Sequence, residues 1–144
     1  MAEFRSSGVD GTIRALRQAD LFDEDAVGRL LERGSGLFVE TVRREMERAP
    51  YRLGSILKRV ARKGKKVRRD KNGDPFVSVT ISGTNPRGQR FAAVAFVLNY
   101  GRRKEFGEIA PAHFWDRAKL QTAEALPQAY AETAEEIYQE RGLT

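Results

Sequence analysis

Cysteine is absent from the sequence, and histidine occurs once, at His113. The lack of cysteine excludes disulfides, thiolate metal ligands, iron–sulfur clusters and a cysteine nucleophile. A single histidine excludes a metal site built from several histidines of one subunit, and the acids near His113 show no metal-binding spacing. We therefore interpret His113 as a packing or capping residue at the start of a helix.

Long apolar runs are also lacking. No window of the sequence approaches the roughly 18 consecutive apolar residues of a membrane-spanning helix. The N-terminus has no apolar signal-peptide segment, so we expect no membrane contact and a protein made in a reducing cytoplasm. The sequence contains neither a G-x-S-x-G nucleophile elbow nor a Walker phosphate loop. We therefore expect a non-enzymatic protein without a cofactor.

Positive charge is present and concentrated. The 144 residues include 26 Lys or Arg and 20 Asp or Glu, which gives a net charge of +6. Residues 58–71 alone have a balance of +8, because they hold nine basic side chains and one acid, Asp70. The rest of the chain is therefore slightly acidic. The nine basic residues are Lys58, Arg59, Arg62, Lys63, Lys65, Lys66, Arg68, Arg69 and Lys71.

Such a dense basic block repels itself and favours exposure to water. We expect residues 57–74 to form an exposed extension, either a loop or a hairpin closed by the Asn72-Gly73 turn. The block contains no aromatic residue, so any contact with nucleic acid would be with phosphates rather than with stacked bases. Three interpretations remain open: binding of nucleic acid, docking on an acidic partner, or a solvated loop that keeps the protein soluble.

Periodic spacing of apolar residues predicts several helices. Asp10 can cap a short helix over residues 11–19. Asp23 can cap a longer helix, in which apolar residues recur at helical spacing from Ala26 to Met46 until Pro50 ends it. The glycines at 34 and 36 lower the helix propensity and indicate a bend or a close crossing.

Two stretches in the middle of the chain predict strands. Residues 75–82 alternate between apolar and small polar side chains, which is typical of a half-buried strand with Val77, Val79 and Ile81 on the inner face. Residues 90–100 are apolar on both faces, so we predict a second, central strand that pairs antiparallel with the first.

The last third of the chain predicts helices around two prolines. Pro111 suits the first turn of a helix, and Pro127 interrupts or restarts it, which gives a C-terminal helix within residues 127–144 that ends near Gly142. We assign Phe96, Leu98, Phe114 and Trp115 to the core. The elements together predict one α+β domain over residues 1–144, with a small antiparallel sheet packed against several helices.

Two stretches carry a family resemblance. In residues 41–60 a helix ends in Ala49-Pro50, and a glycine, a small residue and Ile follow at positions 54–56. In residues 96–118 the predicted buried strand ends in Tyr100-Gly101, and a short loop leads to a Pro-x-x-aromatic helix start at 111–114. This order and spacing resembles the tail-completion, or putative tail-component, family of long-tailed bacteriophages. Two departures are Asn99, where an acid is common, and the basic loop start at 102–104, where small polar residues are usual.

The resemblance implies a structural virion protein at the head–tail junction, or neck, assembled in the cytoplasm of a bacterial host. Its subunits would form a homo-oligomeric ring, expected to be six-fold, that contacts head-closure, connector or tail-tube proteins. Non-specific contact with DNA in the lumen of the ring is a further expectation. We assign partner or anion binding to the nine basic residues of 58–71 and to a second basic point at Arg102, Arg103 and Lys104. The alternative is a small basic nucleic-acid-binding module with a phosphate-contacting loop.

Overall fold

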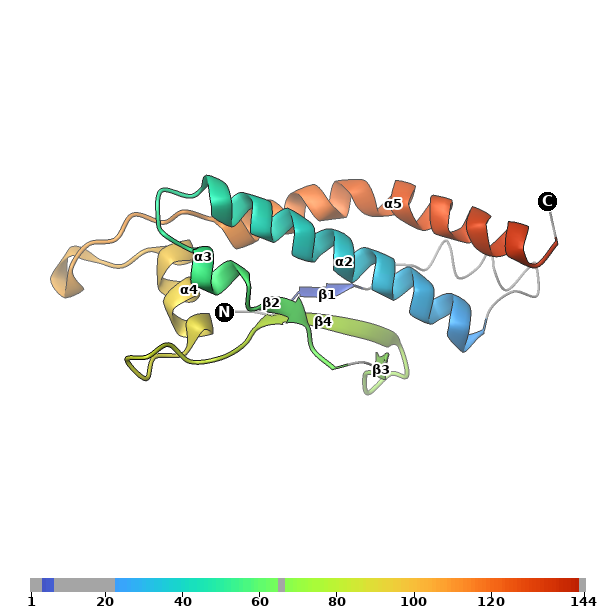
Figure 1. Ribbon diagram of the computed structural model, residues 1–144, viewed down its shortest axis with the longest axis horizontal. Coiled ribbons are helices and arrows are strands. Elements are labelled where there is room, and N and C mark those ends of the chain that lie inside the picture. Colours follow the sequence, from blue (N-terminus) through green and yellow to red (C-terminus); the bar gives the residue numbers. More distant parts are fainter. Residues whose placement is uncertain (1–3, 7–22, 65–66, 143–144) are drawn as a thin grey trace.

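The computed structural model describes residues 4–6, 23–64 and 67–142, the first of these ranges by its backbone alone. The expected helix over residues 11–19, and the basic residues Lys65 and Lys66, lie outside these ranges. Two long helices, α2 (Glu24–Arg48) and α5 (Phe114–Glu140), lie side by side along the length of the molecule (Figure 1). A small antiparallel sheet packs under α2, which confirms the predicted α+β class.

Helix α2 begins and ends where the sequence predicts. The Asp23 carboxylate accepts a hydrogen bond from the Ala26 amide over 2.9 Å, and acidic residues follow in the first turn, where they stabilise the positive end of the helix dipole. Ala49 has extended backbone angles, as a residue before proline prefers, and it closes the helix. The helix continues through Gly34 and Gly36 without a break.

Strand β4 (Pro75–Ile81) is the centre of the sheet. It pairs antiparallel with β1 (Phe4–Ser6) and with β2 (Val60–Arg62), and the short strand β3 (Arg68–Arg69) pairs with its first residues. The predicted inner face of β4 is confirmed, because Val77, Val79 and Ile81 are buried. Ser78, which alternation places on the solvent side, is nevertheless only 1% exposed.

The predicted second strand is wrong, because residues 91–100 form helix α4 (Phe91–Tyr100). An apolar run of this length has no period that separates a strand from a helix, and the partners of β4 are instead β1 and β2. The assignment of Phe96 to the core is also wrong: its side chain is 45% exposed. Leu98 is only partly buried at the edge of the core, whereas Phe114 and Trp115 are fully buried as predicted.

Neither proline of the last third acts as predicted. Helix α5 begins at Phe114, after His113 in the left-handed region with φ 52°, so Pro111 precedes the helix rather than forming its first turn. The helix then runs through Pro127 to Glu140, so there is no separate C-terminal helix. Gly142 adopts φ 73° directly after the helix end, as the sequence predicts.

The main hydrophobic core joins α2, the sheet, α4 and α5. Phe38 of α2 meets Trp115 of α5 edge to face, with ring centroids 5.0 Å apart. The short helix α3 (Gly54–Leu57) contributes Ile56 to the same core, and the 3-10 turn η1 (Lys104–Phe106) lies outside it in the loop before α5. Of the helices that the structure describes, none is both long and apolar enough to cross a bilayer.

Candidate interaction surfaces

The basic segment is built into the sheet. We call its described residues, 58–64 and 67–71, the basic ribbon. The predicted hairpin is confirmed: the Gly73 amide donates to the carbonyl of Asp70 at 3.0 Å, and β3 pairs with β4 on the far side of the turn. Val60 is fully buried in β2, and Val67 packs against the core residue Val77. The described part is therefore anchored to the body of the protein and does not extend away from it.

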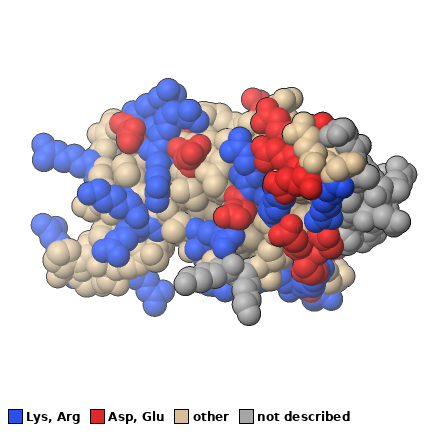
Figure 2. Space-filling model, turned by 45° about the vertical axis from the view of Figure 1, so that its right-hand side comes forward, with Lys and Arg blue, Asp and Glu red and all other residues tan. Residues whose placement is uncertain are grey.

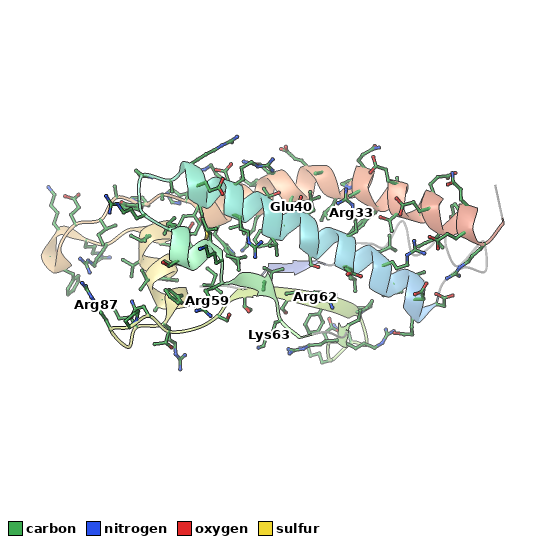
Figure 3. The ribbon with its side chains drawn as sticks, in the orientation of Figure 1. Arg33, Glu40, Arg59, Arg62, Lys63 and Arg87 are labelled. Atoms are coloured by element: carbon green, nitrogen blue, oxygen red, sulfur yellow. The ribbon has the colours of Figure 1, made fainter. Side chains whose placement is uncertain are left out.

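Several of the ribbon's cations nevertheless face water. Lys58, Arg59, Lys63, Arg68 and Lys71 are exposed, and Figure 3 shows Arg59 and Lys63 along the sheet side of the molecule. The guanidinium of Arg59 lies over the ring of Phe91, 5.5 Å from its centroid, which fixes the position of this charge. The exposed side chains form a cationic strip along β2 and the turn.

Two other arginines of the ribbon serve the fold. Arg69 forms an ion pair with Glu24 at the start of α2 and donates to the carbonyl of Gly73 at 2.9 Å. Arg62 is half-buried, and its Nε donates to the carbonyl of Gly64 at 3.2 Å. From α2, Arg43 donates to the carbonyls of Leu57 and Val60 at 3.1 and 2.8 Å and so covers the outer edge of β2.

The structure does not bring the second basic point to the ribbon turn. Arg102, Arg103 and Lys104 lie in the loop between α4 and α5, at one end of the molecule, whereas β3 lies in the other half (Figure 1). Arg102 donates from Nε to the carbonyl of Gly107 at 2.6 Å, which holds its guanidinium against the loop. Arg103 and Lys104 are exposed and form no ion pair with any described residue. The ribbon turn and the second basic point therefore belong to separate surfaces, whereas Arg59 lies beside the start of α4.

Exposed aromatic side chains accompany this second basic point. Phe96 and Tyr100 lie one helical turn apart on α4, with ring centroids 4.8 Å apart and exposed fractions of 45% and 41%. Leu120 is 68% exposed and lies one turn along α5 from Asp116, which contacts Tyr100. We call Phe96, Tyr100 and Leu120 the α4 patch.

A hollow adjoins the α4 patch. It has a volume of about 500 Å³ and is bordered by Tyr100, Arg102, Arg103, Glu108 and Ile109, among others. Burial raises the pKa of the Tyr100 hydroxyl, and the negative charge of Asp116 raises it further. The hydroxyl therefore stays neutral and polar at the rim of the hollow.

Sequence reasoning missed this surface because it placed residues 90–100 inside a sheet. The signal was present: three alanines in ten residues favour a helix, and Phe96 and Tyr100 have the i, i+4 spacing of one helix face.

Buried polar contacts hold the α4 end in shape. The fully buried side chain of Asn99 accepts a hydrogen bond from the Trp115 amide and donates one to the Asp116 carboxylate, both at 2.9 Å. A residue of α4 therefore caps the first turn of α5. Gly101 has φ 82°, and a Cβ there would lie 2.7 Å from the carbonyl oxygen of Ile109. Tyr51 donates to the carbonyl of Ala110 and ties the loop to the chain after α2.

His113 has the position that the sequence predicts, at the start of a helix, but its side chain makes no capping hydrogen bond. Its Nδ1 lies 3.6 Å from the Asp116 carboxylate, and the side chain is about half exposed. Among the described residues, no three histidine or carboxylate side chains gather where they could hold a metal ion.

The part of α5 that follows Leu120 has the opposite charge. Residues 121–140 contain five glutamates and no lysine or arginine. Glu140 pairs with Arg29 of α2 at 2.5 Å, and this hydrogen bond lowers the pKa of its carboxyl group. Glu124, Glu132 and Glu135 are exposed and form no ion pair with any residue that the structure describes. In Figure 2 acidic atoms gather toward one side of the molecule and basic atoms dominate the other.

Comparisons with known proteins add no relative: no family model, no curated protein and no solved structure matches the chain.

Proposed function

We propose that the chain is a structural, non-enzymatic subunit of a tailed-bacteriophage virion, which assembles into a ring and completes the tail or connects it to the head. The observation that carries this proposal is that the two stretches with the family resemblance pack together as one unit. Residues 41–60 supply Met46 and Ile56, and residues 96–118 supply Trp115, to a single hydrophobic core. The Tyr51 hydrogen bond to Ala110 joins the two stretches outside that core.

Each motif residue has a structural task in this unit. Ala49 and Pro50 end α2 and turn the chain toward α3. Gly101 allows the loop to pass close to Ile109 before α5 begins. Phe114 and Trp115, at the helix start, are fully buried. Residues that serve packing rather than chemistry fit a subunit whose role is to present surfaces to neighbours.

The proposal is tested with a phage that lacks this gene. We expect electron microscopy of the lysate to show separate heads and tails, because the junction between them lacks its subunit. Expression of the wild-type chain from a plasmid should restore joined particles, and labelled antibodies should bind at the junction. Normal, joined particles from the deletion phage would refute the assignment.

A nucleic-acid-binding module is the second candidate. The cationic strip of the basic ribbon favours it, because five exposed lysines and arginines, besides the paired Arg69, lie there with only one acid, Asp70, in the same segment. Such a strip suits contacts with phosphates that do not depend on sequence. This function requires that the isolated protein binds duplex DNA, whereas a ring subunit does not require it.

A further inference from the structure

We propose that the α4 patch and the hollow beside it bind the acidic outer face of α5 in a second copy of this chain. This inference rests on the proposed function insofar as that function requires self-association, and it names the surfaces that meet. One surface belongs to the end of the molecule formed by α4 and the loop before α5. The other belongs to residues 121–140 of the neighbouring copy.

The first argument is the apolar surface of α4. A helix that is apolar all round is normally buried on all sides. In α4, however, only Phe91, Ala95 and Asn99 are buried, and the pair formed by Phe96 and Tyr100 is open to water. Exposed aromatic side chains with arginines beside them are the composition of the energetic centre of protein interfaces.

The second argument is the charge of the two surfaces. Residues 84–120, which contain the patch, hold seven basic and three acidic side chains. Residues 121–140 hold five glutamates and no cation. Opposite potentials of this kind attract the two surfaces and suppress the docking of two identical ones. Because both surfaces occur in one sequence, their opposite charges favour a second copy of this chain as the partner.

The third argument is the shape and preparation of the α4 end. The hollow of about 500 Å³ carries Arg102 and Arg103 at its border, and the hydrogen bond to Gly107 already fixes Arg102. A glutamate from the neighbour can pair with these guanidiniums without ordering the loop first. The acidic face of α5 also exposes small apolar residues, Ala123 and Pro127, which can lie against the aromatic patch.

The position of the surfaces determines the kind of assembly. The α4 patch and the C-terminal half of α5 lie toward opposite ends of the long axis (Figure 1). A contact between two different surfaces of the same chain repeats from copy to copy, and it gives a ring when the rotation closes. The docking is therefore head to tail.

Charge exchange between the two surfaces tests the proposal. One variant carries Arg102→Glu and Arg103→Glu, and the other carries Glu132→Lys and Glu135→Lys. We expect the wild-type chain to associate in low-salt buffer, and each variant alone to associate at least about tenfold more weakly, because like charges then face each other. An equal mixture of the two variants should assemble again, because every contact in an alternating assembly pairs opposite charges. Mass photometry and sedimentation velocity measure the species.

Two further variants control the result. Lys63→Glu with Lys71→Glu changes the net charge equally but lies on the basic ribbon, and it should associate like the wild type. Phe96→Ser removes a partly exposed aromatic side chain and should weaken association while circular dichroism shows that the chain is still folded. A monomeric wild-type chain at high concentration, single-surface variants that associate normally, or a mixture that stays monomeric would each overturn the proposal.

The failure of this contact and the failure of the proposed function give different results. If the purified chain assembles as described but the deletion phage forms normal particles, the contact stands and the virion role fails. If the deletion phage loses its junction but the exchanged variants complement it like the wild type, the virion role stands and this contact is wrong.

Discussion

At the scale of single residues, Glu45 is the clearest case of a charge whose environment determines its effect on stability. Its side chain is buried between α2 and α5, where it accepts hydrogen bonds from Gln121 at 2.7 Å and Arg117 at 3.1 Å. Burial by itself raises the pKa of the Glu45 carboxyl, but the two hydrogen bonds and the charges of Arg117 and Arg48 together bring it below the ordinary value of 4.5. The ionised form therefore links the two long helices.

A lowered pKa in the folded state makes stability depend on pH. The contribution of Glu45 is fully present above the pKa of the unfolded chain, near 4.5, and it is lost as the pH falls through the lower pKa of the folded protein. We predict that Glu45→Ala lowers the free energy of unfolding at neutral pH by about 1.5–3 kcal/mol, because it removes hydrogen bonds to a charged group. Urea denaturation between pH 3 and pH 7 measures both effects.

The control for this prediction is Glu47→Ala, which removes the same charge from an exposed position of the same helix. It should change the free energy of unfolding by less than about 0.5 kcal/mol. A Glu45→Ala variant that keeps the acid dependence of the wild type would show that other carboxyl groups cause it.

At position 101 the backbone conformation itself requires glycine. With φ 82° and ψ 179° it occupies a region that is essentially confined to glycine, and a Cβ would meet the Ile109 carbonyl oxygen at 2.7 Å. We predict that Gly101→Ala lowers the free energy of unfolding by about 1–3 kcal/mol. The matched substitution Gly54→Ala, where a Cβ meets nothing within 4 Å, should not destabilise the protein. Thermal unfolding followed by circular dichroism compares the two; equal losses would contradict this reading of Gly101.

At the scale of elements, the sequence predicts those with a clear period or cap. The Asp23 cap and the apolar spacing of residues 26–46 predict α2, and the alternation of residues 75–82 predicts β4. Helix α4 could not be predicted in the same way, because apart from Asn99 its residues are apolar or aromatic on every side, and the period that decides between helix and strand is missing. The exposure of Phe96, and with it the α4 patch, follows only once the helix is known. The basic residues were recognisable from composition, but their division into two surfaces depends on tertiary structure.

Helix α5 is the other element that sequence patterns predict wrongly, because they place a break at Pro127. A proline inside a helix lacks an amide donor and clashes with the carbonyl four residues before it, yet α5 continues because packing of its whole length against α2 outweighs that cost. Pro127 is exposed, so its replacement leaves no cavity. We predict that Pro127→Ala raises the free energy of unfolding, by up to about 3 kcal/mol.

Equilibrium denaturation measures this increase. The comparison variant is Ala131→Gly, one turn later on the same exposed face, which should lower stability by about 1 kcal/mol. A Pro127→Ala chain that is less stable than the wild type would mean that the proline shapes α5 to fit α2.

At the scale of the whole molecule, the separation of charge is the feature that the fold adds to the composition. The net charge of +6 describes a moderately basic protein, but the structure distributes it over a cationic strip on the sheet side, a basic α4 end and an acidic helix face. Neutralisation within the chain is local: Arg69 pairs with Glu24, and Arg29 pairs with Glu140. The cations that remain exposed on the ribbon are therefore available to an anionic partner.

Salt dependence of DNA binding tests the strip directly. Five exposed cations that neutralise about four phosphates would give a slope of about −4 in a plot of log affinity against log salt concentration. The triple variant Lys63→Glu, Arg68→Glu and Lys71→Glu should flatten that slope by about three, because each lost cation removes about one phosphate contact. Arg69 is left unchanged because its reversal would place a second acid beside Glu24 and disturb the start of α2. A control variant with the same change in net charge, Arg102→Glu, Arg103→Glu and Lys104→Glu, should keep most of the slope, since these residues lie away from the ribbon turn, in the loop before α5.

Fluorescence anisotropy of a labelled duplex measures the affinity of both variants at each salt concentration. Absence of binding at low salt would contradict a nucleic-acid-binding role for the ribbon, and equal losses in the two variants would mean that only net charge matters.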